Sequence, residues 1–255
     1  MKEINKLPQI TIAFWIMKIC ATILGETAGD LLSMTLHAGY ALSSVILLSF
    51  FLVTLSIQLF SKKYHPVIYW LVILATSTAG TTMSDFMDRT LNLGYATGSL
   101  ILVTLLVVTL TIWRLSEKSL SVTNIKSFRG EVFYWIAILF SNTLGTALGD
   151  FLSDSSGLGF LGGAFLIGSL LLFIILAYYF TKISHVVLFW LAFILTRPFG
   201  ATFGDLLTKP TEKGGLNFGT IGSSIVLFAI LTILLIISII KINSIDKQYM
   251  QQNSL

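Results

Sequence analysis

Four aspartates close four copies of one short motif, and carboxylates that recur inside apolar segments can bind cations or protons. The copies read GETAGD, GTTMSD, GTALGD and GATFGD, and they end at Asp30, Asp85, Asp150 and Asp205. An ionisable side chain at membrane depth costs about 2.5–3.5 kcal/mol to insert, so such a residue is either functional or paired with another charge. The motif therefore predicts a layer of buried carboxylates.

Polar residues precede each aspartate at four-residue intervals, which places them on one face of a helix. The first copy carries Lys18, Thr22 and Glu26 before its aspartate, and Glu26 is the one carboxylate a helical turn deeper than the aspartates. We call this row the polar stripe. The matching residues of the later copies are Ser77 and Thr81, Asn142 and Thr146, and Arg197 and Ala201.

We expect the polar stripe to form a substrate or proton site. Its members are Glu26, Asp30, Asp85, Asp150, Asp205, Thr22, Thr81, Asn142 and Thr146, with Lys18 and Arg197 balancing their charge. A metal ion bound there would use Glu26, Asp30, Asp85 and Asp150. These hard oxygen ligands suit Mn²⁺, Mg²⁺ or Ca²⁺, so a divalent cation is the cofactor that the residues indicate.

Structural roles compete with this interpretation. Each aspartate can cap the turn or helix that follows it, or accept hydrogen bonds from a neighbouring Thr. Asp205 is expected to pair with Arg197, two turns earlier on the same helix, and Glu26 with Arg197 forms an alternative static salt bridge. Under these alternatives the carboxylates stabilise the fold and bind no ligand.

The motif belongs to an internal repeat. Each aspartate lies fifteen residues after a Trp, at Trp15, Trp70, Trp135 and Trp190, so successive Trp residues are 55, 65 and 55 residues apart. His65 and His185 each stand five residues before their Trp, which indicates two pseudo-equivalent halves, 1–118 and 119–255. The predicted repeats span roughly 10–61, 66–115, 131–181 and 185–241, within a single transmembrane domain over 1–255.

Composition identifies the elements that carry these residues. The chain has 255 residues, of which 55% are hydrophobic and 11% charged, and its mean hydropathy is +0.87. Soluble domains are less apolar than this, so we expect an all-α membrane protein. The apolar runs come in pairs, each near the roughly 20 residues of a bilayer-spanning helix, and predict eight spans. These runs are 10–34, 39–60, 66–87, 94–115, 131–153, 159–181, 185–208 and 217–241.

The first helix of each repeat, the motif helix, is expected at the centre of the molecule. A row of small residues runs beside its polar stripe, and such rows let transmembrane helices approach closely. We call this row the small ridge; it contains Gly25 and Gly29, Gly80 and Ser84, Gly145 and Gly149, and Gly200 and Gly204. The second helices begin after turns at Gly39, Gly94 and Gly159 and after a looser stretch at 215–218, and their apolar composition predicts a lipid-facing outer layer.

Two helices per repeat make all four motif helices parallel. Lys and Arg concentrate at the termini and in the loops between repeats, while the turns within repeats hold Arg89, Lys209 and Lys213. Because positive loops face the cytoplasm, we expect both termini there, with the aspartates in the outer part of the bilayer. The net charge of +4 therefore reflects membrane topology, and no nucleic-acid partner is expected.

Four tandem two-helix units, each with a Trp and a Gly-xxx-Gly-Asp-like motif, resemble a family of bacterial integral membrane proteins known as a repeat of unknown function. The resemblance covers nearly the whole chain and implies eight helices in a bacterial inner membrane, without implying an activity. The chain departs from the strict motif at Ser84, and Glu26 and Arg197 are charges that the other repeats lack.

Three classes of function remain from the sequence. The carboxylate layer and the absence of a nucleotide motif favour a secondary transporter that exports a small cation, such as manganese, in exchange for protons. A non-transporting receptor or cofactor-binding protein, with structural aspartates, is the alternative. An enzyme is not expected, since the spans contain no HExxH, no GxSxG and no Cys and His pair. The partners expected are the lipid bilayer and a small cation, and a homodimer is compatible with the sequence.

Overall fold

The structure, a computed structural model, describes residues 7–122, 125 and 127–252. Eight long helices account for most of this part of the chain, in which no strand occurs, and all eight are long and apolar enough to cross a membrane. The predicted all-α class and the eight spans are confirmed. The helices are α1 (Ile12–Asp30), α2 (Tyr40–Phe60), α3 (Pro66–Asp85), α4 (Gly94–Glu117), α5 (Phe128–Asp150), α6 (Gly159–Phe180), α7 (His185–Thr208) and α8 (Thr220–Gln252).

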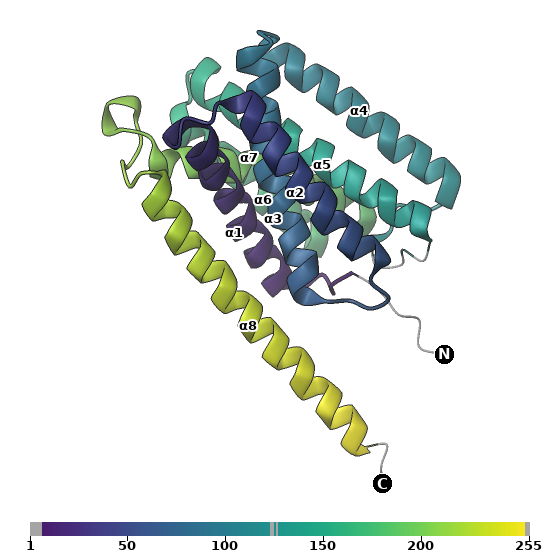
Figure 1. Cartoon of the computed structure of the whole chain (residues 1–255). Helices are drawn as coiled ribbons and strands as arrows, with labels where there is room; N and C mark the ends of the chain where they lie inside the picture. The colour runs from purple at the N-terminus through teal and green to yellow at the C-terminus, as the bar shows by residue number, and fades with distance from the viewer. Residues whose placement is uncertain (1–6, 123–124, 126, 253–255) are drawn as a thin grey trace.

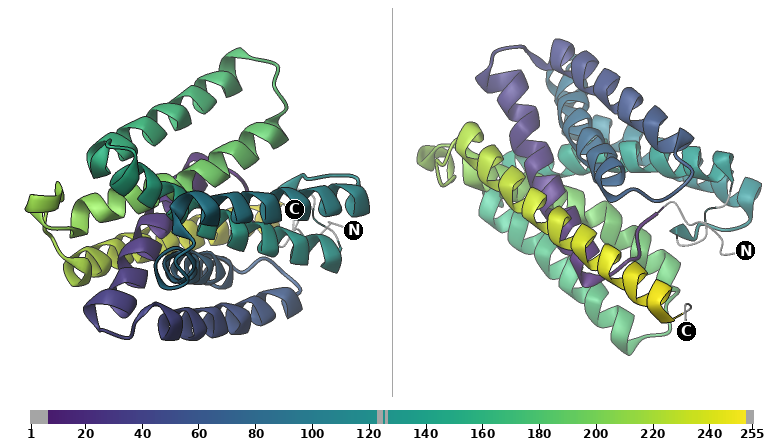
Figure 2. Two further views of the ribbon diagram at one scale, coloured as in Figure 1. Left: turned by 90° about the horizontal axis from the view of Figure 1, so that it is seen from above. Right: turned by 60° about the horizontal axis from the view of Figure 1, so that its bottom comes forward.

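The four motif helices form a closed ring at the centre of the bundle. In this ring α1 packs on α3, α3 on α5, α5 on α7, and α7 on α1 (Figures 1 and 2). The spans of the motif helices are between 56% and 72% buried, whereas those of the other helices are between 6% and 28% buried. The expected central position of the motif helices is confirmed.

Each outer helix packs mainly on the motif helix of the next repeat along the chain. Helix α2 lies on α3, α4 on α5 and α6 on α7, and α8 returns to α1 to close the circle. Figure 1 shows α8 along the side of the bundle, ending at the same side where α1 begins. A two-helix repeat of the sequence is therefore not a packing unit of the fold.

Several exposed hydroxyls on the outer helices hydrogen-bond to the backbone of their own helix. Ser49 donates to the carbonyl of Val45, and Thr104 to that of Leu100, each four residues earlier and at 2.7 Å. Exposed hydroxyls of α6 and α8 do the same. A hydroxyl in lipid has no water to bond, so these internal bonds suit a surface that faces the bilayer.

The turn after each motif helix differs between the first three repeats and the fourth. A π-helical turn follows α1, α3 and α5, namely η1 (Leu31–Thr35), η2 (Phe86–Thr90) and η4 (Phe151–Ser155). Helix α7 instead ends at Thr208, and a loop with the 3-10 turn η5 (Thr211–Lys213) leads to α8. Glycines with positive φ stand at the start of all four outer helices: Gly39 (74°), Gly94 (70°), Gly159 (66°) and Gly219 (71°). The fourth, Gly219, directly follows the looser stretch 215–218 in which the turn is expected.

Candidate functional site

The small ridge of each motif helix packs against the polar stripe of the next. A Cβ added at Gly149 would lie 2.7 Å from the Cβ of Ala201, and one added at Gly204 would lie 2.9 Å from the Cβ of Glu26. Gly29 meets Thr81 in the same way. The prediction that Gly29, Gly149 and Gly204 sit where motif helices nearly touch is confirmed. This contact turns the four polar stripes toward the ring's interior.

Arg197 lies at the centre of the ring with no exposed surface. Its Nη2 is 3.0 Å from Oε2 of Glu26 and 2.8 Å from the hydroxyl of Thr146, and it also contacts the hydroxyl of Thr81. Its Nη1 donates to the carbonyl of Thr22 at 2.9 Å. Both Thr81 and Thr146 also donate to Oε2 of Glu26. One guanidinium from α7 thus connects α1, α3 and α5.

Lys18 occupies the next layer toward the start of α1, also without exposed surface. Its Nζ donates to Oδ1 of Asn142 at 3.3 Å and lies 4.0 Å from the centroid of the Phe193 ring. Asn142 donates in turn to the hydroxyl of Thr76 at 2.9 Å. Lys18 forms no ion pair among the described residues, so a cation–π contact and an amide hold it.

Lys209 bridges two aspartates of neighbouring repeats at the far end of the ring. Its Nζ lies 2.7 Å from Oδ2 of Asp30 and 3.0 Å from Oδ1 of Asp205. The expected pair between Asp205 and Arg197 is therefore wrong. The reason is geometric, since Lys209 follows Asp205 by one helical turn, while Arg197 points into the ring toward Glu26.

Arg89 bridges the other two aspartates in the equivalent way. Its Nε lies 2.9 Å from Oδ1 of Asp85, and its Nη2 lies 3.0 Å from Oδ2 of Asp150 and 3.7 Å from Oδ2 of Asp154. Arg89 follows Asp85 by four residues, as Lys209 follows Asp205. Arg89 thus joins the aspartates of the second and third repeats, and Lys209 joins those of the fourth and first repeats. The two bridges follow the two-fold relation that the Trp spacing indicates.

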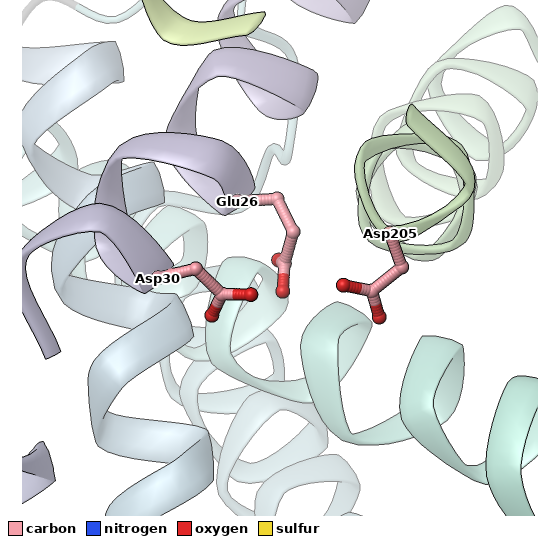
Figure 3. A group of neighbouring side chains, drawn as sticks. All are labelled: Glu26, Asp30 and Asp205. Carbon is pink, nitrogen blue, oxygen red and sulfur yellow. The ribbon is translucent and has the colours of Figure 1, made fainter. Parts of the chain in front are cut away.

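Glu26, Asp30 and Asp205 form the tightest carboxylate group in the part of the chain that is described. Each offers an oxygen within 4.8 Å of the others, and all three residues are buried. Figure 3 shows the three side chains, two from α1 and one from α7, pointing into a common space. Oxygen ligands about 2.0–2.6 Å from one ion can be separated by this distance, so the spacing suits a single cation.

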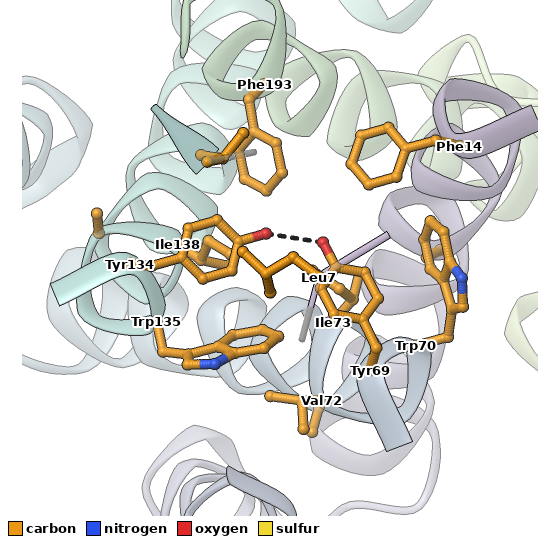
Figure 4. Packing of buried hydrophobic residues seen from close by; sticks show 14 of the residues in the cluster. Leu7, Phe14, Tyr69, Trp70, Val72, Ile73, Tyr134, Trp135, Ile138 and Phe193 are labelled. Atoms are coloured by element: carbon orange, nitrogen blue, oxygen red, sulfur yellow. Dashed lines mark hydrogen bonds between the residues drawn. The ribbon is translucent and has the colours of Figure 1, made fainter. Parts of the chain in front are cut away.

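Aromatic side chains close the opposite end of the ring. The residue before each Trp is aromatic and buried, namely Phe14, Tyr69, Tyr134 and Phe189. We call these four the aromatic collar. The hydroxyls of Tyr69 and Tyr134 are 2.7 Å apart, and Figure 4 shows this hydrogen bond between the rings, with Phe14 and Phe193 beside it. The collar fills the axis of the ring where the motif helices begin.

The charges of the site almost cancel. Five stripe carboxylates face the four cations Lys18, Arg89, Arg197 and Lys209, leaving one net negative charge. Burial by itself lowers the pKa of the Lys209 ammonium, but the carboxylates of Asp205 and Asp30 outweigh burial and raise this pKa above its ordinary value. Lys209 therefore stays a cation over the physiological pH range.

The residues expected at the site fall into three groups. Glu26, Asp30 and Asp205 converge, with Lys209 bound to the two aspartates, and Thr22, Thr81 and Thr146 lie one layer deeper beside Arg197. Asp85 and Asp150 lie together around Arg89, so the four proposed metal ligands are divided between two places. Asn142 belongs to the Lys18 layer.

The capping alternative does not describe these aspartates. Asp30, Asp85 and Asp150 are N-cap residues of the π-helical turns, but their side chains make no capping hydrogen bond. Their carboxylates accept ion pairs from Lys209 and Arg89 instead. The aspartates therefore link neighbouring repeats.

Sequence reasoning missed Arg89 and Lys209 as members of the site, because both were counted as loop charges. Their common position, four residues after Asp85 and Asp205, was the available signal. The aromatic collar was also missed, although an aromatic residue before every Trp is visible in the sequence.

No curated protein and no solved structure matches the chain. The family model described as Repeat of Unknown Function (DUF347) matches four times, at residues 13–64, 68–119, 133–184 and 188–241. Each match covers one motif helix and its outer helix, and together they include the polar stripes, the collar and both bridging cations. The chain thus belongs to the DUF347 repeat family, with four tandem copies that close into one ring of membrane-spanning helices.

Proposed function

We propose that this protein is a secondary transporter of the bacterial inner membrane that exports a small cation, with Mn²⁺ as the first candidate, in exchange for protons. The observation that carries the proposal is the convergence of Glu26, Asp30 and Asp205 from two repeats within 4.8 Å. Transporters built from repeats place their ion sites between those repeats. Buried carboxylates there can hold either a cation or protons.

The ends of the ring differ as alternating access requires. At the aspartate end the side chains of Lys209 and Arg89 keep 19% and 32% of their surface exposed, so this layer is partly open at the surface of the bundle. At the other end the aromatic collar is buried and closed by the hydrogen bond between Tyr69 and Tyr134. The described conformation suits a site that faces the aspartate side, and transport would require the collar to open.

In the proposed orientation of the protein, the aspartate end of the ring faces the outside of the cytoplasmic membrane. Arg89 and Lys209 neutralise buried aspartates, which leaves Lys213 as the one unpaired cation of the described turns at that end. The loops at the other end carry exposed Lys62, Lys63 and Lys182. This asymmetry supports cytoplasmic termini.

A non-transporting membrane protein is the second candidate, and a specific observation favours it. Each of the five stripe carboxylates has a cationic partner within 3.0 Å. Such pairs can simply hold four repeats together, as buried ion pairs do when their hydrogen bonds are complete.

Transport of Mn²⁺ by the purified protein in sealed liposomes separates the two candidates. We expect uptake of Mn²⁺ coupled to proton movement, read with a trapped metal dye and a trapped pH dye. Asp30→Asn should abolish both signals, and Lys213→Met, on an exposed loop, should leave both unchanged. The second candidate is favoured if Mn²⁺, Mg²⁺ and Ca²⁺ each enter liposomes at the same rate with and without the parent protein.

A further inference from the structure

We propose that Lys209 is a tethered competitor of the transported cation: its ammonium occupies the place of the substrate between Asp30 and Asp205, and a divalent cation enters by displacing it. This inference rests on the proposed function and assigns a role to one residue of that site. Lys209 binds the carboxylates as a single point charge on a flexible stem. Its Nζ sits 2.7 Å and 3.0 Å from the two carboxylates, and 19% of its side chain is exposed.

The charges around Lys209 select the class of cation. Glu26, Asp30 and Asp205 carry three negative charges, and the pair of Arg197 with Glu26 supplies one positive charge. When the ammonium withdraws, two negative charges remain unbalanced. A divalent cation neutralises them and a monovalent cation does not. Since buried charge is costly unless it is compensated, the site should prefer Mn²⁺ over Na⁺ or K⁺.

The equivalent cation Arg89 is built to stay in place. It binds Asp85 through Nε and Asp150 through Nη2, a forked geometry that a lysine cannot make. Its guanidinium also lies 5.8 Å from the centroid of the Tyr95 ring. Arg89 stands within the helical turn η2, whereas Lys209 lies just past the end of α7 in an extended conformation. The two halves thus provide one fixed bridge and one exchangeable bridge.

Withdrawal of Lys209 does not require its backbone to move. The amides of Leu216, Asn217 and Phe218 bond to the carbonyls of Leu206, Lys209 and Leu207, which ties the loop to the end of α7. The side chain, however, stands at the rim of the ring, and rotation about its own bonds carries the ammonium from the carboxylates into water. The site can therefore exchange its cation while the ring stays closed.

Binding of Mn²⁺ to purified variants tests the role of Lys209. We expect Lys209→Met to raise the apparent affinity for Mn²⁺ about ten-fold. This is the gain expected if the ammonium of Lys209 occupies the site about nine-tenths of the time and the substitution removes it. Lys209→Arg keeps a cation in place and should not raise it. Lys213→Met, on the same loop, should bind as the parent does, and Arg89→Met should not gain affinity.

A second measurement uses the parent protein, so that it does not depend on the folding of a variant. A membrane-impermeant amine reagent should modify Lys209 more in 1 mM Mn²⁺ than in 1 mM Na⁺, relative to Lys213 as the internal reference. If the parent transports Mn²⁺ but neither the affinity of Lys209→Met nor the labelling of Lys209 changes, the competitor role is overturned and the transporter proposal stands. If the parent neither binds nor transports a divalent cation, both are overturned.

Discussion

Arg197 and Glu26 form an ion pair in the interior of the ring that has no copy among the described residues of the other repeats. Both side chains are buried, and the guanidinium also donates to two hydroxyls and two carbonyls, those of Thr81 and Thr146 and of Thr22 and Ser77. Desolvating two charges is repaid only when such additional bonds are present. The pair is therefore sensitive to the loss of either partner.

We expect Arg197→Met to lower the free energy of unfolding by about 3–5 kcal/mol, because Glu26 is left as an unpaired buried charge. The double variant Arg197→Met with Glu26→Gln should recover part of this loss, since no charge is then left unpaired. Thermal melts in detergent of the parent, both single variants and the double variant measure the coupling. Additive losses would show that the two residues do not stabilise each other.

The two aspartate pairs are expected to respond differently to metal. Asp30→Asn removes a carboxylate from the group around Lys209, so Mn²⁺ should no longer raise the melting temperature. Asp150→Asn alters the Arg89 side and should keep the Mn²⁺ effect, although it lowers stability by about 1–3 kcal/mol because the bond from Arg89 is no longer charge-assisted. Melts with and without millimolar Mn²⁺ check both. A loss of the metal effect in Asp150→Asn would place all four aspartates in one site.

For single residues, the sequence identifies which side chains are unusual in a membrane span but not which of them form pairs. The four-residue spacing puts Glu26 and the aspartates on one face of each helix, because a helix has a fixed period. Pairing depends on the order of helices around the ring and on side-chain direction, which the repeat spacing leaves open. Asp205 therefore appeared to belong to Arg197, although Lys209 is its partner.

Neighbouring motif helices touch through the small ridge of one helix and the polar stripe of the next. Glycine is needed where the backbones approach, since a Cβ added at Gly145 would overlap the side chain of Arg197. The sequence predicts this close approach from its small-residue spacing. It does not predict that the outer helix lies on the next repeat, because nothing in an evenly apolar helix marks its neighbour.

We expect Gly149→Leu to prevent accumulation of folded protein, because its Cβ alone would lie 2.7 Å from the Cβ of Ala201. Gly222→Leu is the matched control, since no atom lies within 4 Å of a Cβ added there, on the outer helix α8. Expression level and size-exclusion profile in detergent compare the two. A stable, monodisperse Gly149→Leu protein would contradict the close contact of α5 and α7.

On the scale of the whole molecule, orientation follows from charge. A single Cys introduced at Lys62 or Lys182 should resist an impermeant thiol reagent applied to intact cells, while one at Leu91 or Lys213 should react. These four positions are exposed, so that labelling reports on the side of the membrane and not on burial. The native Cys20 is buried and should give little background. The reverse pattern of labelling would invert the protein in the membrane.

The packing of α7 and α8 on α1 also has a consequence for biosynthesis. Helix α1 leaves the ribosome first, yet α7, α8 and Lys209 are made last. Until then Glu26 lacks Arg197, so the nascent first span holds an unpaired acid in the bilayer or waits beside the insertion machinery. A chain that stops after Phe180 should therefore be degraded quickly, and Glu26→Gln should lengthen its half-life in a pulse-chase experiment. The last quarter of the chain would then determine whether the first quarter stays in the membrane or is degraded.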